Sequence, residues 1–506
     1  MDGFQERLRA LPPERLRGIR RGIEKESLRV QASGKLALTP HPLALGSALT
    51  HPYITTDFSE AQLEMRTGAH ESVERCLEEL TQVHQFVYHA IGDELLWVDS
   101  MPCILPAEET IPIGIYGSSN VGRCKSVYRV GLGHRYGRCM QTISGIHYNW
   151  SMPGVSTDTY FGLIRNFRRH SFLLLYLFGA SPAVCLSFVA DRQHGLQSLN
   201  PDTLYLPHST SLRMGRLGYQ SNAQASLAVS YNSLEGYAAS LQEALTEPYP
   251  AYAAIGIHDL GGGYNQLATS LLQIENEFYG TIRPKRVIFP GERPLHALRQ
   301  RGVEYVEVRC LDLNPFLSVG IDVQTIRFLD LLLLHCLLTD SPPDTPQEIA
   351  TLGRNQHLVA ARGREPGLSL TRGSDQVLLA EWGTQVLDEC AALAEVLDAV
   401  HVGTGYGDAL EAAYTALRDA SEPPSAQVLA SMASDFDNSY IQFALTQSEK
   451  AKAALLKIPM PIERETYFWQ LAQKSIEEQK RIEAADTEPF ESYLERYLST
   501  PSLMLE

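Results

Sequence analysis

Several segments of the chain alternate apolar and polar residues, the pattern of strands that pack on one face and are polar on the other. In residues 305–309, Val306 and Val308 point one way while Glu307 and Arg309 point the other. The strands predicted from this alternation cover residues 21–30, 61–67, 143–152, 226–231, 272–278 and 303–311. We therefore expect a sheet with one packed face and one polar face.

Other segments repeat their apolar residues with the period of a helix. The helices predicted in this way cover residues 73–97, 232–246, 320–338, 375–400, 405–419 and 462–484. Proline-rich stretches at 341–346 and 422–427 indicate turns that bound a helical C-terminal third. We expect one large α+β unit, in which residues 1–340 form the main body and residues 341–506 form a mainly helical part packed on it.

One apolar segment, residues 171–190, carries no charge over a length that could span a bilayer. Gly179, Ser181 and Pro182 lie in its middle, where they would end a helix. We therefore favour a buried helix followed by a buried strand, with a membrane span as the alternative. The shorter apolar run at 328–338 contains an aspartate and a histidine and predicts a core helix.

The composition is that of an ordinary globular protein, with 44% apolar and 20% charged residues among 506. The formal net charge of -16 argues against sequence-independent binding to nucleic acid, which needs lysine and arginine to neutralise phosphates. Eight scattered cysteines form no C-x-x-C pair, and the first twenty residues have no apolar signal segment. We expect reduced thiols and a cytoplasmic location.

Polar side chains share a face on four predicted strands. The sets are Glu24 with Glu26, Glu64 with Arg66, His147 with Asn149 and Ser151, and Glu307 with Arg309. Carboxylates and a histidine projecting from a sheet suit a hard divalent cation such as magnesium, which prefers oxygen ligands. The alternative for each set is the solvated face of an antiparallel strand. Four sets weaken that alternative without eliminating it.

Familiar nucleotide and hydrolase motifs are absent from the sequence. Residues 117–124 have the glycine spacing of a P-loop, but Arg123 and Cys124 replace its lysine and its serine or threonine. Residues 131–133 lack the third glycine of a dinucleotide fingerprint, and neither G-x-S-x-G nor H-E-x-x-H occurs. If ATP binds, metal ions and arginines must hold its phosphates.

Long stretches of the sequence, spread in order over almost the whole chain, resemble the single-chain bacterial glutamate-cysteine ligase family. They include RGIEKESLRV, HPLALGSALTHPYITTDFSEAQLE, RYGRCMQTISGIHYNWSMP, TSLRMGRLGYQS, QIENEFYGTIRPKR and GVEYVEVRCLDLNPF. The resemblance implies a glutamine synthetase-like α+β fold, with a largely antiparallel sheet curved into a funnel and helices packed outside. It also implies ATP- and Mg2+-dependent joining of L-glutamate to L-cysteine through a γ-glutamyl phosphate, with Mn2+ as a substitute ion, in the first step of glutathione biosynthesis.

The resemblance also assigns roles to individual residues. Its metal ligands correspond to Glu24, Glu26, Asp57, Glu64, His147 and Glu307. Of these, Asp57 is not marked by periodicity. Arg309 matches an arginine near the transferring phosphoryl group, so Glu307 and Arg309 are the expected catalytic residues, and Arg213 matches one that holds a substrate carboxylate. The cysteine pocket corresponds to Phe58, Tyr128, Leu132, Gln141, Tyr219 and Tyr279.

Other functions remain open at this point. A ligase of the same fold could join glutamate to another amine, although Tyr128, Tyr219 and Tyr279 favour cysteine. A catalytically silent protein that binds thiols or nucleotides would be expected to have lost a metal ligand, whereas all six positions are intact. For the ligase we expect a monomer that acts on small molecules, with feedback inhibition by glutathione and without nucleic acid or membrane partners.

Overall fold

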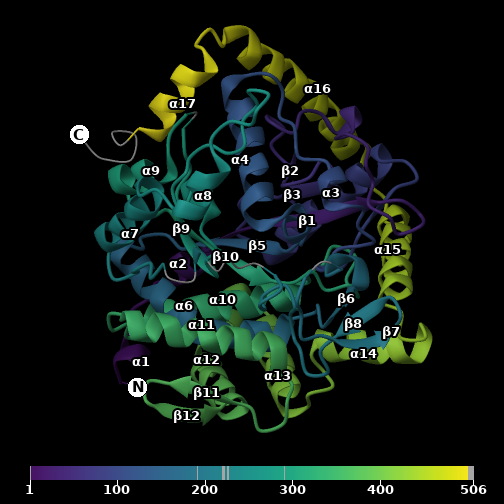
Figure 1. The fold of residues 1–506 in the computed structure, drawn as a ribbon. Helices are drawn as coiled ribbons and strands as arrows, with labels where there is room; N and C mark the ends of the chain where they lie inside the picture. Colours follow the sequence, from purple (N-terminus) through teal and green to yellow (C-terminus); the bar gives the residue numbers. More distant parts are fainter. Residues whose placement is uncertain (1, 191, 219–222, 225–226, 290, 500–506) are drawn as a thin grey trace.

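The computed structural model describes residues 2–190, 192–218, 223–224, 227–289 and 291–499, and its centre is an antiparallel sheet (Figure 1). The strands follow the order β2-β3-β1-β5-β10-β9, with β4 paired to the end of β1. Their bounds are β1 Arg20–Val30, β2 Ile54–Thr56, β3 Gln62–Arg66, β4 Leu95–Leu96, β5 Ile146–Ser151, β9 Ile282–Lys285 and β10 Tyr305–Leu311. The predicted mixture of helices and antiparallel sheet is confirmed.

Four of the six predicted strands are confirmed, as β1, β3, β5 and β10. The predictions at 226–231 and 272–278 are wrong, since the described residues of these segments contain no strand. In the second segment a short 3-10 helix covers Glu275–Glu277, and both glutamates are buried. Glu275 pairs with Arg293 at 2.8 Å and Glu277 with Arg135 at 2.9 Å. The alternating glutamates of this segment therefore form buried ion pairs and do not belong to a β-strand.

Three helices cover the packed face of the sheet, namely α3 Val73–Ala90, α6 Thr157–Phe178 and α10 Val323–Leu338. Each helix is preceded by an N-cap residue whose side chain accepts a hydrogen bond from a backbone N–H in the first turn. These N-caps are Ser72, Ser156 and Asp322. The sheet meets the helices with buried apolar side chains: Ile23, Met65, Ile146, Tyr148, Trp150, Val306 and Val308.

The uncharged run at 171–190 forms the end of α6 and then the buried strand β6 (Ala183–Cys185), as predicted. Helix α6 ends before Gly179, where a Cβ atom would collide with the carbonyl oxygens of Leu175 and Thr210. Strand β6 pairs with β8 (Thr203–Tyr205), which pairs with β7 (Gln197–Asn200). Among the described residues, no helix combines the length and apolarity that a bilayer crossing requires.

The predicted helices correspond to α3, α7, α10, α12, α13 and α16, with two differences at their ends. Residues 95–96 form β4, and residues 375–378 form β12 (Asp375–Leu378), which pairs with β11 (Ser369–Arg372). The later helices are α11 Pro346–Arg362, α12 Leu379–His401, α13 Gly405–Arg418, α14 Pro424–Asp435, α15 Tyr440–Lys457, α16 Ile462–Ala485 and α17 Phe490–Leu498. In Figure 1, α16 and α17 cross the end of the molecule opposite α12 and α13.

The remaining α-helices lie before Gly302. They are α1 Asp2–Arg9, α2 Pro13–Arg17, α4 Asn120–Tyr136, α5 Arg138–Gln141, α7 Leu234–Thr246, α8 Pro250–Ile255 and α9 Pro294–Arg301. Helix α4 brings Tyr128 and Leu132 to the core cluster that contains Phe58. The strands and α4 thus supply most of the predicted site residues.

Candidate functional site

The polar face of the sheet gathers its charges through strand register. Strand β5 lies between β1 and β10, so that Glu24 of β1 is opposite His147 and Glu307 of β10 is opposite Asn149. On the other side of β1, Glu26 is opposite Glu64 of β3. Side chains far apart in the sequence therefore meet on one sheet face.

Glu24, His147 and Glu307 form the first group of this face, which we call the carboxylate cluster. Each offers one ligand atom, and these atoms all lie within 4.8 Å of one another. Asn149 Nδ2 donates to Glu24 Oε1 at 2.9 Å, and His147 Nδ1 lies 3.5 Å from Glu24 Oε2. Within the described part of the chain, the buried His147 Nε2 makes no hydrogen bond. This is the arrangement of a site that can accept a cation.

Three cations surround the Glu307 carboxylate. Lys285 Nζ lies 3.1 Å from Oε1, and Arg309 Nη1 and Arg283 Nη1 lie 3.0 and 4.0 Å from Oε2. Burial by itself would raise the pKa of Glu307, but Lys285 and Arg309 hold it well below its usual value. Glu307 is therefore ionised at neutral pH.

Lys285 and Arg283 were missed by the sequence analysis. They alternate in residues 282–285 with Ile282 and Pro284, both buried, so the strand period could have marked them. The stretch is only four residues long, and its proline disfavours a strand prediction. Pairing of β9 with β10 places Arg283 directly opposite Glu307.

Glu24 and His147 of the carboxylate cluster both have pKa values below their ordinary ones. Burial would raise the pKa of Glu24, but the contact with His147 and the charge of Lys285 lower it to about 2. Burial and the nearby Arg309 charge lower the pKa of His147. A neutral imidazole beside ionised carboxylates is the form that binds a metal ion.

Glu26, Asp57 and Glu64 form the neighbouring group. Asp57 directly follows β2, and Glu26 Oε2 accepts a hydrogen bond of 2.8 Å from the Gly145 backbone. Burial and the Asp57 charge raise the pKa of Glu26 well above its usual value. The pKa of Glu64 is raised to about 7 by burial and by the charges of Glu24 and Asp57, although Arg66 opposes this increase. These carboxyl groups repel one another, and a divalent cation among them would favour their ionised forms.

The solvated-strand alternative fails for two of the carboxylates, since Glu26 is 2% and Glu307 1% exposed. Buried carboxylates need compensating charge, whereas surface pairs do not. All six predicted ligands thus lie on or beside one polar face. Their function as ligands stays a prediction.

The two predicted arginines contact each other through the backbone. Arg213 Nη2 donates to the Arg309 carbonyl oxygen at 2.9 Å, and Arg213 Nη1 lies 3.8 Å from Asp312 Oδ1. Arg213 is buried beneath Gly145, where a Cβ atom would collide with its guanidinium group. Arg309 Nη1 lies between Glu307 and His147, 3.4 Å from His147 Nδ1. The Arg309 guanidinium group therefore faces the carboxylate cluster, whereas Arg213 contacts the Arg309 backbone.

Five of the six predicted cysteine-pocket residues lie in one region. Phe58 and Leu132 are buried in one apolar cluster, and Tyr128 and Tyr279 pack against it. Gln141 Nε2 donates to the Tyr279 hydroxyl at 2.9 Å. Tyr219 lies outside the described residues.

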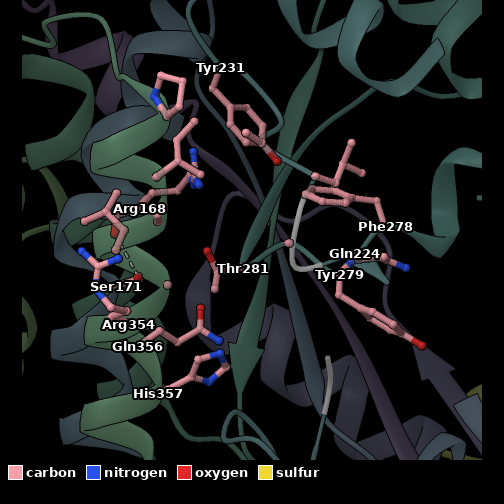
Figure 2. A pocket seen from close by; sticks show the side chains of 18 residues that line it. Arg168, Ser171, Gln224, Tyr231, Phe278, Tyr279, Thr281, Arg354, Gln356 and His357 are labelled. Carbon is pink, nitrogen blue, oxygen red and sulfur yellow. Dashed lines mark hydrogen bonds between the residues drawn. The ribbon is translucent and has the colours of Figure 1, made fainter. Parts of the chain in front are cut away.

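Cavities flank this region. The cavity in Figure 2, of about 500 Å³, has Arg168, Ser171, Arg354, Gln356 and His357 on its helical side and Tyr231, Phe278 and Tyr279 across from them. It contains Tyr279 and no other predicted site residue. A cavity of about 30 Å³ joins Tyr279 to Arg309, and one of about 270 Å³ is lined by Lys125, Tyr128 and Arg129. The chemistry of the polar face, and not cavity size, locates the site.

Comparison with known proteins gives one consistent result. The sequence model of the glutamate-cysteine ligase family matches residues 8–359. The chain is 50% identical over 494 residues to the glutamate-cysteine ligase of Pseudomonas putida (strain W619), covering 94% of each chain. It is 47% identical over 516 residues to that of Janthinobacterium sp. (strain Marseille), covering 98% of this chain and 97% of the relative.

Solved structures agree with the sequence comparisons. The glutamate-cysteine ligase of Francisella tularensis, in complex with AMP, is similar with a TM-score of 0.90 at 36% identity, over 95% of this chain and 97% of that one. A bifunctional glutathione synthetase from Pasteurella multocida is similar with a TM-score of 0.68 at 26% identity. That match covers 88% of this chain and 53% of the other.

Proposed function

The chain belongs to the glutamate-cysteine ligase family, and we propose that it joins the γ-carboxyl of L-glutamate to the amine of L-cysteine while converting ATP to ADP and phosphate. The protein is thus a ligase of the first step of glutathione biosynthesis. The observation that carries the choice of site is the carboxylate cluster, with its ligand atoms within 4.8 Å of one another on a buried, polar sheet face.

The residues present fit magnesium. Glu24, His147 and Glu307 would hold one ion. The buried His147 Nε2 makes no hydrogen bond to any described residue and lies 3.7 Å from Glu26 Oε1, so His147 stands between the two groups of carboxylates. Glu26, Asp57 and Glu64 would hold another, since burial and the charges of neighbouring carboxylates raise the pKa of both Glu26 and Glu64. Bound there, magnesium, or manganese in its place, would neutralise and orient the phosphate oxygens of ATP.

The reaction needs an activated carboxyl group, because an unactivated carboxylate has no adequate leaving group for attack by an amine. The γ-carboxylate of glutamate attacks the γ-phosphorus of ATP, which gives a γ-glutamyl phosphate and ADP. The neutral cysteine amine then attacks the acyl carbon and displaces phosphate, and the nitrogen loses one proton as the amide bond forms. Arg309 points into the carboxylate cluster and would stabilise the charge on the transferring phosphoryl group. Lys285 contacts the other oxygen of the same Glu307 carboxylate.

Substrate binding is proposed for the residues behind and beside this centre. Arg213 would hold a substrate carboxylate with its planar fork. Phe58, Tyr128, Leu132, Gln141 and Tyr279 would form the cysteine pocket together with Tyr219. The hydrogen bond between Gln141 and Tyr279 supports a preformed wall for this pocket.

We propose further that the sheet is the funnel of a glutamine synthetase-like fold and that residues 1–340 form its catalytic body. Residues 341–506 would be a mainly helical part packed on it, which is supported by the seven helices α11 to α17 described there. We also propose a cytoplasmic monomer inhibited by glutathione. Size-exclusion chromatography and a glutathione titration of the initial rate test these last two points.

One assay tests the reaction as a whole. The protein is incubated with glutamate, cysteine and MgATP, and the dipeptide is detected by mass while ADP is measured by a coupled enzyme. Alanine, 2-aminobutyrate and diamines are then compared with cysteine at equal concentration. We expect the γ-glutamyl dipeptide and ADP in equal amounts, with cysteine preferred. A better rate with a diamine would instead identify a ligase of the same fold with another amine substrate.

A further inference from the structure

A second group of metal-binding side chains lies in the helical layers behind the packed face of the sheet. His170 comes from α6, and His335 and Cys336 come from the buried α10. One ring nitrogen of each histidine and the Cys336 Sγ all lie within 4.8 Å of one another. We call these three residues the thiol cluster.

The spacing of the thiol cluster is close to that of a bound soft metal ion. Cys336 Sγ lies 3.9 Å from His170 Nδ1, and the two imidazole rings are 5.4 Å apart between centroids. Tetrahedral zinc with ordinary Zn–S and Zn–N bond lengths would separate such a sulfur and nitrogen by about 3.6 Å. A shift of a few tenths of an ångström would therefore bring these two atoms to ligand positions.

The hydrogen bonding of His335 is that of a metal-binding histidine. Its ring is fully buried, and Nε2 lies 2.7 Å from Glu389 Oε2 of α12, so Nε2–H donates to the carboxylate. In this tautomer Nδ1 is unprotonated, so it presents a buried lone pair, and it makes no hydrogen bond to any described residue. Histidine ligands commonly donate their second ring N–H to a carboxylate in this way. A packing role alone would leave Nδ1 unsatisfied at a cost.

The thiol cluster borders a cavity at His170. A cavity of about 430 Å³ is lined by His170 and by Trp382 of α12, whose rings meet edge to face at 6.5 Å. Two arginines also line the cavity, but Arg169 is paired with Glu348 at 2.7 Å and Arg372 lies over the Trp382 ring. Glu348 therefore neutralises Arg169, whereas Arg372 keeps its positive charge at the cavity.

We propose that His170, His335 and Cys336 bind one thiophilic divalent ion of the zinc class, distinct from the ions of the catalytic site, with a water molecule as the fourth ligand. Two imidazoles and a thiolate suit zinc and not magnesium, which prefers oxygen. The ion would join α6 to α10. We therefore expect it to stabilise the fold without entering the reaction.

Cobalt(II) is the probe for the test, since it binds at zinc sites and gives an absorption band when a thiolate ligates it. Metal-stripped, full-length protein is titrated with Co2+. We expect the thiolate band to saturate at one equivalent, to disappear on addition of Zn2+ and to persist in a large excess of Mg2+. No thiolate band in the wild-type protein would overturn the proposal.

Three variants locate the ion. Cys336→Ser should lose the band, whereas Cys103→Ser, which changes another fully buried thiol, should retain it. His147→Asn removes the histidine of the carboxylate cluster and should also retain the band. A band that survives Cys336→Ser, or disappears with His147→Asn, would place the ion elsewhere and contradict the proposal.

A fourth variant tests the same site in case Cys336→Ser does not fold. His170 is only partly buried, and His170→Gln should fold while weakening Co2+ binding at least tenfold. One equivalent of Zn2+ should also raise the Tm of the wild-type protein and leave that of His170→Gln almost unchanged. Equal Tm increases in both proteins would show that the ion does not join these helices.

Discussion

The two histidine-containing clusters of this protein differ in what surrounds them. In the carboxylate cluster, His147 lies among carboxylates, and Lys285, Arg283 and Arg309 neutralise Glu307. In the thiol cluster, His335 has a thiol, a second imidazole and one supporting carboxylate. Both groups are largely buried. Burial alone therefore does not define a site, because the ligand atoms and nearby charges decide what binds.

The difference also separates catalysis from stability. Three cations beside Glu307 weaken the binding of a bare metal ion but attract phosphate, so metal and nucleotide should bind the carboxylate cluster together. The thiol cluster needs no anionic substrate. Removing ligands from the two clusters should therefore affect different measurements.

The largest effect is expected from Glu307→Gln. The change removes a metal ligand and leaves Lys285 and Arg309 without their carboxylate, so ADP formation at saturating substrates should fall by about 10³-fold or more with the fold intact. The matched control is Glu304→Gln, which changes a half-exposed glutamate just before the same strand. Near-normal turnover of Glu307→Gln at ordinary magnesium would contradict the catalytic role of the carboxylate cluster.

The next effect concerns Arg309, whose guanidinium group lies between Glu307 and His147. Arg309→Ala should lower kcat by about 10²- to 10³-fold, because a preorganised donor to the transferring group is lost. Arg286→Ala, which removes an arginine from the edge of the sheet, serves as the control. A loss of less than tenfold would mean that Arg309 is only a charge partner of Glu307.

A more selective effect is expected at Arg213. Lysine lacks the planar fork, so Arg213→Lys should raise the KM of one substrate by about tenfold while changing kcat less. The KM values of glutamate and cysteine are measured separately. If neither value changes, Arg213 does not bind a substrate carboxylate.

The independence of the two clusters gives a fourth test. Saturating MgATP should leave the Co2+ thiolate band unchanged, and Cys336→Ser should retain kcat within about twofold while losing the Zn2+-dependent increase in Tm. Absorption spectra and initial rates are recorded on the same samples. A large loss of kcat in folded Cys336→Ser would connect the thiol cluster to the reaction.

The smallest effect concerns Lys25, on the packed face of β1 opposite the carboxylates. Burial lowers its pKa to about 7 from an ordinary value of 10.5. Between these values the unfolded chain binds more protons, so stability should rise with pH from about 7 to 10, by at most about 1.4 kcal/mol per pH unit. Lys25→Met should flatten this rise in thermal unfolding curves. An unchanged slope would show that Lys25 is not buried as a titrating group.

Much of the sheet could be predicted from the sequence, because the period of a strand is a local property. Strands β1, β3, β5 and β10 have it over five residues or more, and their polar faces marked five of the six expected metal ligands. Asp57 was expected only through the family resemblance, because it follows a three-residue strand. The strand prediction at residues 272–278 was wrong, since alternating charges can also form buried ion pairs.

The sequence by itself determined which residues share a strand face and, through its long family motifs, the reaction. Only the tertiary structure decided that β5 lies between β1 and β10, which brings Glu24 to Glu307 and adds Arg283 and Lys285 from β9. It alone joined His170 to His335 and Cys336, because packing of α6 against α10 leaves no periodic mark in either helix. Local sequence sets the direction of a side chain, whereas its distant neighbours depend on how the elements pack.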